Sequence, residues 1–408
     1  MTHHTTATSR RLRLAVAALA GVATLATPTF AAAAPDHDAA AASERAARVP
    51  DSAGARRAPS LRVNTVLRGL DHPWDIAFTP NGSMLVTERN LGRIMLRTPR
   101  GNVRTLVGIV PNLWVSGETG LMGIEVDPRF RGNRRFYTCH GFRSGSTTDV
   151  RVVAWRANPS LTSAQVVDNL VTGIQVSSGR HGGCRLRFGG KGALFIGTGD
   201  AAITGSARDR TSLAGKVLRV DRLTGYALPS NPFSGSSNAN TRKLFTFGHR
   251  NVQGLALRPG TPQMWSVEHG TFRDDEVNLL QSGGDYGWQA GPGYDESPPM
   301  TNFDLPGPQV GAKWSSGNPT VATSGATWLT GPRWQDWNRR LAVAALKDQS
   351  LRIMQFTAGG SLVDVLEPAA LNGSYGRLRA AEMGPSNILY LTTDNGDGAD
   401  RVIAVSAS

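Results

Sequence analysis

The sequence predicts an all-β protein, a β-propeller of about six blades, and three observations support this fold class. Downstream of the N-terminal segment there is almost no helical periodicity, whereas short β-rich runs bounded by Gly, Asn, Pro and Asp recur throughout. The chain holds 47 Gly, which suits a backbone that turns often. A strand–turn–strand unit also repeats, in which the second apolar strand ends in polar residues.

The repeated unit defines the expected domain. Copies lie at residues 76–88, 123–128, 186–200, 254–259 and 381–393, and a weaker copy lies at 341–356. Paired strands that repeat without helices are typical of a propeller, whose blades are small antiparallel sheets around a channel. A β-sandwich would not repeat itself so regularly. We therefore expect one propeller domain of about six blades over residues 61–408.

The N-terminal segment predicts export. Arg10, Arg11 and Arg13 precede an apolar run that begins at Leu14 and is too short to span a bilayer. We expect residues 1–34 to form a signal peptide, and residues 35–60, which offer little to bury, to form a disordered leader. The arginine pair leaves both the twin-arginine and the general secretory route open, so the expected location is secreted or extracytoplasmic.

Charge and cysteine content narrow the classes of function. The net charge is +13, but the arginines are scattered and form no basic helix or aromatic-interleaved stripe, so nucleic-acid binding is not expected. A solvated basic surface or attraction of an anionic cofactor explains the excess better. Only Cys139 and Cys184 are present, and in an exported protein they predict a disulfide ahead of a buried free pair or a metal site.

The first polar motif contains His181, followed by two glycines and an apolar strand. A histidine in this position can project from a loop into a cavity with open space around it. Asp200 ends the partner strand of the hairpin and is placed to orient the imidazole, as a carboxylate orients a general base. A lone histidine is more often a turn residue or a satisfied polar group, and it is Asp200 that strengthens the case for catalysis.

The second polar motif contains Arg250 and Asn251, which follow a predicted strand and can donate hydrogen bonds to carbonyl or carboxylate oxygens. A strand end that faces water is the alternative interpretation. Downstream, residues 268–276 and 283–288 combine glycines with carboxylates. Backbone carbonyls in such loops suit a hard cation such as calcium.

A third set of residues is cationic. Arg377 and Arg379 are two positions apart and would point the same way in a strand, and Lys347 lies earlier in the chain, within residues 345–349. Three cations that face one channel would require an anionic ligand. On an exposed strand they would carry no functional meaning.

Six motifs, in order, resemble the soluble glucose/sorbosone dehydrogenase family, also called aldose sugar dehydrogenases. They lie at residues 117–123, 181–186, 213–219, 248–254, 274–278 and 283–288, and the resemblance extends from about Leu67 to Val405. It implies a six-bladed propeller that binds pyrroloquinoline quinone (PQQ) and calcium at the mouth of the channel. It also implies oxidation of an aldose at the anomeric carbon to the lactone, with electrons passed to an external acceptor.

The resemblance also assigns roles. His181 would be the base, Asp200 its support, and Arg250 the neighbour of the reactive quinone carbonyl. The cofactor's oxygens and carboxylates would be held by Arg250 together with Glu118, Asn251, Lys347, Arg377 and Arg379. The cofactor's calcium would be held by the carbonyls of Gly270 and Thr271, and a separate structural calcium by Glu276 and Tyr286.

The chain departs from the family pattern at two positions. Glu118 stands where soluble glucose dehydrogenase has Gln, and Arg180 stands where it has Asp, so cofactor binding is a firmer expectation than the identity of the sugar. No dinucleotide fingerprint is present, which argues against a nicotinamide enzyme. A calcium-dependent lactonase would leave the three cations without an anion, and a non-catalytic propeller that binds glycans or proteins would not need His181. The sequence does not predict the sugar, the electron acceptor or the oligomeric state.

Overall fold

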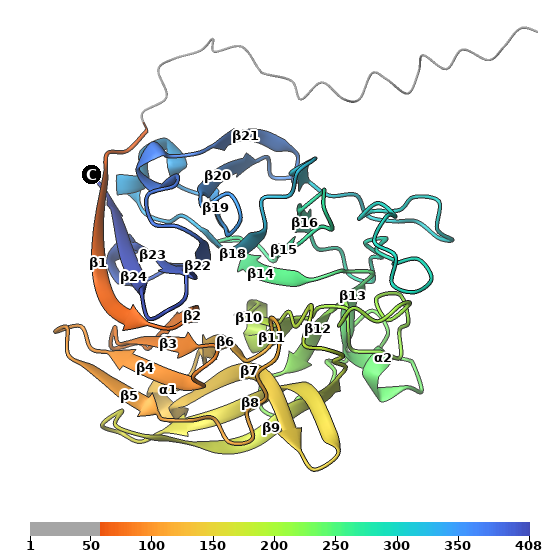
Figure 1. Ribbon diagram of the computed structural model, residues 1–408, viewed down its shortest axis with the longest axis horizontal. Helices are drawn as coiled ribbons and strands as arrows, with labels where there is room; N and C mark the ends of the chain where they lie inside the picture. Colours follow the sequence, from red (N-terminus) through yellow and green to blue (C-terminus); the bar gives the residue numbers. More distant parts are fainter. Residues whose placement is uncertain (1–57) are drawn as a thin grey trace, which may run out of the picture. The chain divides into compact units, whose positions relative to one another are not determined.

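The computed structural model describes residues 58–408, which form six antiparallel sheets of four strands each (Figure 1). The prediction of an all-β, six-bladed β-propeller is confirmed. The expected signal peptide and most of the expected leader lie outside the described residues. Between residues 58 and 408, no helix has the length and apolar character needed to cross a membrane.

The first three blades follow one another along the chain. Blade 1 contains β2 (Pro73–Phe78), β3 (Met84–Glu88), β4 (Arg93–Arg97) and β5 (Val103–Val107). Blade 2 contains β6 (Leu121–Val126), β7 (Arg135–Ser144), β8 (Thr147–Ala157) and β9 (Ala164–Ile174). Blade 3 contains β10 (Arg185–Phe188), β11 (Ala193–Gly197), β12 (Lys216–Asp221) and β13 (Leu244–Phe247).

The remaining blades complete the ring. Blade 4 contains β14 (Val252–Leu257), β15 (Met264–Glu268), β16 (Glu276–Leu279) and β17 (Trp314–Ser315). Blade 5 contains β18 (Thr323–Trp328), β19 (Leu341–Ala345), β20 (Leu351–Phe356) and β21 (Leu362–Leu366). Blade 6 contains β22 (Leu378–Met383), β23 (Leu389–Thr393), β24 (Asp400–Ala407) and, from the start of the described chain, β1 (Leu61–Leu70).

Blade 6 joins the two ends of the described chain. β1 pairs with β24 from Leu61 opposite Ala407 to Leu70 opposite Asp400. The first strands of the blades, β2, β6, β10, β14, β18 and β22, contact one another in that order, and β22 contacts β2 in turn. Closure of the ring in this way leaves few unpaired strand edges to attract other chains.

Helices are short and lie in the connections. α1 (Phe130–Asn133) links β6 to β7, and α2 (Ala239–Lys243) links β12 to β13. α2 begins after Asn238, whose side-chain oxygen accepts hydrogen bonds from two backbone N–H groups of its first turn. The 3-10 helices are η3 (Gly190–Gly192), η4 (Pro332–Trp337), η5 (Ala369–Leu371) and η6 (Pro385–Asn387).

The core lies within and between the blades. Every residue of β3, β11, β15 and β19 is buried. This explains why β11 and β19 are continuous apolar runs, whereas β3 and β15 each begin apolar and end in a buried glutamate. A disulfide joins Cys139 of β7 to Cys184, which directly precedes β10, with their Cα atoms 5.9 Å apart. The predicted disulfide is therefore confirmed, and it links blade 2 to blade 3.

Strand direction determines which loops meet. In a blade of four antiparallel strands, the loop from the second to the third strand lies on the same face as the connection to the next blade. His181 and Arg250 belong to connections between blades, whereas Asp200 and Gly270 belong to second-to-third-strand loops. The same rule places Glu118, Lys347 and Arg377 on this face, which we call the site face.

Candidate active site

His181 and Asp200 form a buried pair. His181 Nδ1 lies 2.8 Å from Asp200 Oδ1, and the two side chains are 3% and 1% exposed. A neutral imidazole that donates from Nδ1 to this carboxylate carries its lone pair on Nε2. In the described part of the chain no group hydrogen-bonds Nε2. This is the arrangement of a histidine general base oriented by a carboxylate.

The glycines after His181 allow its loop to approach β11. His181 itself has a φ of 54°, in the left-handed region that non-glycine residues seldom adopt. A Cβ atom at Gly183 would lie 2.7 Å from the backbone nitrogen of Gly199, so a larger residue would push the loop away. The Gly183 N–H donates to Asn251 Oδ1 at 3.2 Å. The loop that carries the base is therefore fixed to blades 3 and 4.

Asp200 accepts more hydrogen bonds than the one from His181. Trp288 Nε1 and the Tyr294 hydroxyl donate to Oδ2 at 2.6 and 2.7 Å, and the Ala202 N–H donates to Oδ1 at 2.9 Å. Burial raises the pKa of Asp200, but the hydrogen bonds and charge of its partners outweigh burial and hold the pKa below its usual value. Asp200 therefore stays ionised beside the imidazole.

Arg250 is buried and held on several sides. Nη1 donates to the carbonyl of His269 at 3.1 Å, and Nε donates to Glu296 Oε1 at 3.1 Å. Its backbone N–H donates to Glu268 Oε2 at 3.0 Å. Glu296 also forms an ion pair with Arg180. Arg180, one of the two residues that depart from the family pattern, therefore has a carboxylate partner that it shares with Arg250.

Glu118 and Asn251 meet next to the base. Asn251 Nδ2 donates to Glu118 Oε2 at 2.9 Å, and the Glu118 carboxylate also accepts from the His181 backbone N–H. Burial raises the pKa of Glu118, but the nearby His181 and His269 and the Asn251 amide hold it below its ordinary value. Glu118 thus places a negative charge where the family's glucose enzyme has a neutral amide.

The three predicted cations differ in their surroundings. Arg379 is buried, and its Nε and Nη2 donate to Asp394 Oδ2 at 2.9 and 2.7 Å. Arg377 is 44% exposed in its side chain and lies 3.9 Å from the same oxygen. Lys347 is exposed, and the only hydrogen bond of its side chain to a described residue is one of 3.5 Å to Thr320. Lys347 and Arg377 are therefore the two cations most open to an anionic ligand.

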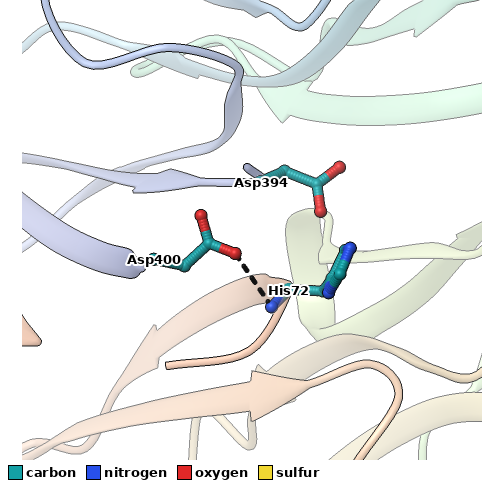
Figure 2. Close-up of side chains that lie close together, drawn as sticks. All are labelled: His72, Asp394 and Asp400. Atoms are coloured by element: carbon teal, nitrogen blue, oxygen red, sulfur yellow. Dashed lines mark hydrogen bonds between the residues drawn. The ribbon is translucent and has the colours of Figure 1, made fainter. Parts of the chain in front are cut away.

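A second group of side chains lies where the first and last blades meet. His72, Asp394 and Asp400 have potential ligand atoms within 4.8 Å of one another (Figure 2). Each oxygen of Asp400 already accepts two hydrogen bonds, one of them from the His72 N–H at 3.1 Å. Asp394 is paired with Arg379. We therefore assign this cluster to closure of the ring and not to a metal centre.

The turn at Gly270 and Thr271 offers backbone oxygens. Neither of these two carbonyls accepts a hydrogen bond from any described residue. The turn is tight, because a Cβ atom at Gly270 would lie 2.5 Å from the carbonyl oxygen of Asp274. It is fixed by Asp275, whose Oδ1 accepts from the Gly270 N–H at 2.8 Å. Oxygens presented in this way fit a hard cation.

Glu276 belongs to a separate acidic cluster. Asn278 Nδ2 donates to Glu268 at 2.9 Å and to Glu276 at 3.2 Å, and Asn278 Oδ1 is buried without a hydrogen-bond partner. Burial and the charge of Glu268 raise the pKa of Glu276 to about 8. The Tyr286 hydroxyl donates to the carbonyl of Leu279, so the backbone carbonyl of Tyr286, which accepts no hydrogen bond from a described residue, is the oxygen that Tyr286 could offer. Two carboxylates and an unpaired amide oxygen also fit a hard cation.

Sequence reasoning assigned no role to Trp288, Tyr294 or Glu296. All three lie in the β16–β17 connection, residues 280–313, which begins on the face opposite the site. The chain near Asp285 runs parallel to the end of β13, and the Trp288 N–H donates to the carbonyl of Gly248 at 2.9 Å. This path returns the chain to the site face. In the sequence, the motif at residues 283–288 was the only indication that this connection reaches the site.

Comparison with known proteins identifies the family. The profile of the Glucose / Sorbosone dehydrogenase family matches residues 70–403. The chain belongs to the glucose/sorbosone dehydrogenase family. It is 30% identical over 349 residues to the aldose sugar dehydrogenase of Escherichia coli, and the match covers 83% of this chain and 91% of that protein. It is 28% identical over 275 residues to quinoprotein glucose dehydrogenase B of Acinetobacter calcoaceticus, covering 60% and 56%.

Solved structures agree with this assignment to the glucose/sorbosone dehydrogenases. The PQQ-bound aldose sugar dehydrogenase of Streptomyces coelicolor superposes with a TM-score of 0.71 and 29% identity, over 87% of this chain and 100% of that one. The apo-form of the Escherichia coli soluble aldose sugar dehydrogenase gives a TM-score of 0.75 and 27% identity, over 86% and 100%. The expected family is confirmed, and the protein is an oxidoreductase of the sugar dehydrogenase class.

Proposed function

We propose that this glucose/sorbosone dehydrogenase is a PQQ- and calcium-dependent enzyme that oxidises an aldose at the anomeric carbon to the lactone. The observation that carries the proposal is the His181–Asp200 pair, held at 2.8 Å, in a chain of this family. A non-catalytic propeller would have no use for a buried histidine oriented in this way. The relative from Streptomyces coelicolor, whose structure contains PQQ, supports the choice of cofactor.

The residues present fit a flat, polyanionic quinone. Lys347 and Arg377 supply positive charge, and Arg250 and Asn251 supply N–H donors close to the base. The carbonyls of Gly270 and Thr271 would hold the calcium, and Glu276 with its neighbours would hold a second, structural calcium. When bound, PQQ would accept the hydride from the sugar, and calcium would stabilise the negative charge that develops on the quinone oxygen.

Proton transfer falls to His181. Nε2 accepts the proton of the anomeric hydroxyl, because the Nδ1 proton is directed at Asp200. The imidazole thereby gains a positive charge that the ionised carboxylate of Asp200 stabilises. The sugar loses this proton and the hydride from its anomeric carbon, which leaves the carbonyl group of the lactone. The two electrons then pass to an external acceptor.

The proposal also includes a location outside the cytoplasm. The arginine-rich start and apolar run of the N-terminal segment are typical of an export signal. A disulfide between Cys139 and Cys184 suits an oxidising compartment.

Reconstitution tests the proposed function. Purified apoprotein is titrated with PQQ and calcium, and binding is followed by the absorbance of the quinone. A panel of aldoses is then screened with an artificial dye acceptor, and the product is analysed for the lactone. We expect dye reduction that requires the quinone, calcium and an aldose together. Tight quinone binding without oxidation of any aldose would contradict the assigned reaction.

A further inference from the structure

We propose that Tyr294 is a positioning residue for the base. Its hydroxyl holds Asp200 and His181 in the arrangement that leaves Nε2 of His181 free to accept a proton. The catalytic meaning of this proposal rests on the proposed function. The orientation of the imidazole itself does not depend on the proposed function, and it can be measured without cofactor or substrate.

The Tyr294 hydroxyl contacts both members of the pair. It donates to Asp200 Oδ2 at 2.7 Å, and its oxygen lies 2.9 Å from His181 Nδ1. Since its one hydrogen is given to Asp200, the phenol oxygen can only accept from His181. Nδ1 thus faces two acceptors, the phenol oxygen and Asp200 Oδ1, which are satisfied only when Nδ1 carries the proton. Tyr294 therefore favours the tautomer whose lone pair is on Nε2.

Tyr294 differs from the other donors to Asp200. Trp288 Nε1 and the Ala202 N–H donate to Asp200 but not to His181. Of the described residues, only Tyr294 hydrogen-bonds both Asp200 and His181. Burial and the negative charge of Asp200 also raise the pKa of the Tyr294 hydroxyl well above its usual value. The hydroxyl therefore remains a donor and does not act as a second base.

The segment around Tyr294 is anchored on two sides. The Tyr294 N–H donates to Thr204 Oγ1 at 3.0 Å, in the loop that follows Asp200. Two residues further on, Glu296 pairs with Arg180 and Arg250. Because the segment is fixed to both the Asp200 loop and Arg250, the hydroxyl is held in place before any ligand binds. Such fixed support is what keeps a catalytic group in its productive orientation.

The test compares Tyr294→Phe with Tyr226→Phe, a matched control at a side chain that is 74% exposed. The tautomer of His181 is read in each apoprotein from its imidazole nitrogen resonances by NMR, assigned with a His181→Gln sample. We expect the Nδ1–H form in the parent and control, and a mixture with the Nε2–H form in Tyr294→Phe. In reconstituted enzyme, kcat should fall about tenfold while KM and quinone affinity change little.

A double-mutant cycle with Asp200→Asn provides the second measurement. If Tyr294 acts through Asp200, Tyr294→Phe should lower kcat much less in the Asp200→Asn background than in the parent. Additive losses, or a Tyr294→Phe apoprotein whose His181 tautomer equals that of the parent, would overturn the proposal. If the parent enzyme oxidised no aldose, the proposed function would fail, and the tautomer comparison would still decide the role of Tyr294.

Discussion

Individual charged residues at this site differ mainly in how far they are already paired with other side chains of the protein. Arg377 and Arg379 look equivalent in the sequence, two positions apart and expected to hold the same anion. In the structure Arg379 is 7% exposed in its side chain and bonded to Asp394, whereas the Arg377 side chain is 44% exposed. The sequence could not predict this difference, because Asp394 follows another strand, β23.

Replacing the two arginines separately should therefore have different effects. Arg377→Ala should weaken PQQ binding by about tenfold or more, the contribution of one charge-assisted contact, and should leave the melting temperature unchanged. Arg379→Ala should also lower the melting temperature, because the buried Asp394 would lose both hydrogen bonds from Arg379 and keep only the 3.9 Å contact with Arg377. Quinone titration and thermal unfolding measure both effects, with the exposed Arg156→Ala as the control. If Arg377→Ala bound the quinone as tightly as the control, Arg377 would be a solvated surface residue and not part of the cofactor site.

The His181–Asp200 pair, in contrast, could be predicted. Asp200 follows the strand that pairs with the one after His181, so a hairpin register alone brings the two residues together. Tyr294 could not be predicted, because its contact with Asp200 joins residues from two blades.

At the level of strands and loops, the repeat predicted the blades but not the longest connection. Residues 280–313 carry no strand–turn–strand pattern, and strand direction alone would leave them on the face opposite the site. Their return along β13 depends on backbone contacts such as the one between Phe247 and Asp285. Backbone contacts of this kind leave little trace in residue type, so no role could be assigned to Tyr294 or Glu296 from the sequence.

The loop that follows Asp200 offers a prediction at this level. Lys216 of β12 is buried, and its Nζ donates to the carbonyls of Ser206 and Ala207 at 2.6 and 2.9 Å and also to that of Ala214. Lys216→Met would leave these buried carbonyls without their donor, so the free energy of unfolding should fall by about 3 kcal/mol or more. Denaturant unfolding measures the loss.

Lys243→Met is the matched control for Lys216→Met, because Lys243 makes one 3.3 Å hydrogen bond at the surface. Equal stability of the two variants would show that Lys216 does not support the loop.

The whole molecule is held by two long-range links. β1 pairs with β24 and closes the ring, and the disulfide joins blade 2 to blade 3. The sequence predicted the disulfide because an exported chain with two cysteines usually pairs them. It predicted the number of blades because each blade repeats the same unit. It did not show that the first described strand completes the last blade, since β1 has no hairpin partner beside it in the chain.

Removal of the disulfide should destabilise the propeller. The bond closes a loop with a sequence separation of 45, for which chain entropy gives a contribution of about 4 kcal/mol. The Cys139→Ser/Cys184→Ser variant should therefore unfold at a lower temperature than the parent.

Thiol titration of the denatured, unreduced parent should find no free thiol, and two titratable thiols would contradict the disulfide.

The most direct test of the central claim, that His181 is the base for sugar oxidation, is the rate at which an aldose reduces the bound quinone in His181→Gln and in the parent. Rapid mixing of cofactor-loaded enzyme with sugar gives this rate without the external acceptor. We expect unchanged cofactor affinity and a rate lower by about 100-fold or more, the usual contribution of positioned proton transfer. Reduction at the parent rate in His181→Gln would contradict the mechanism even with the fold and cofactor as described.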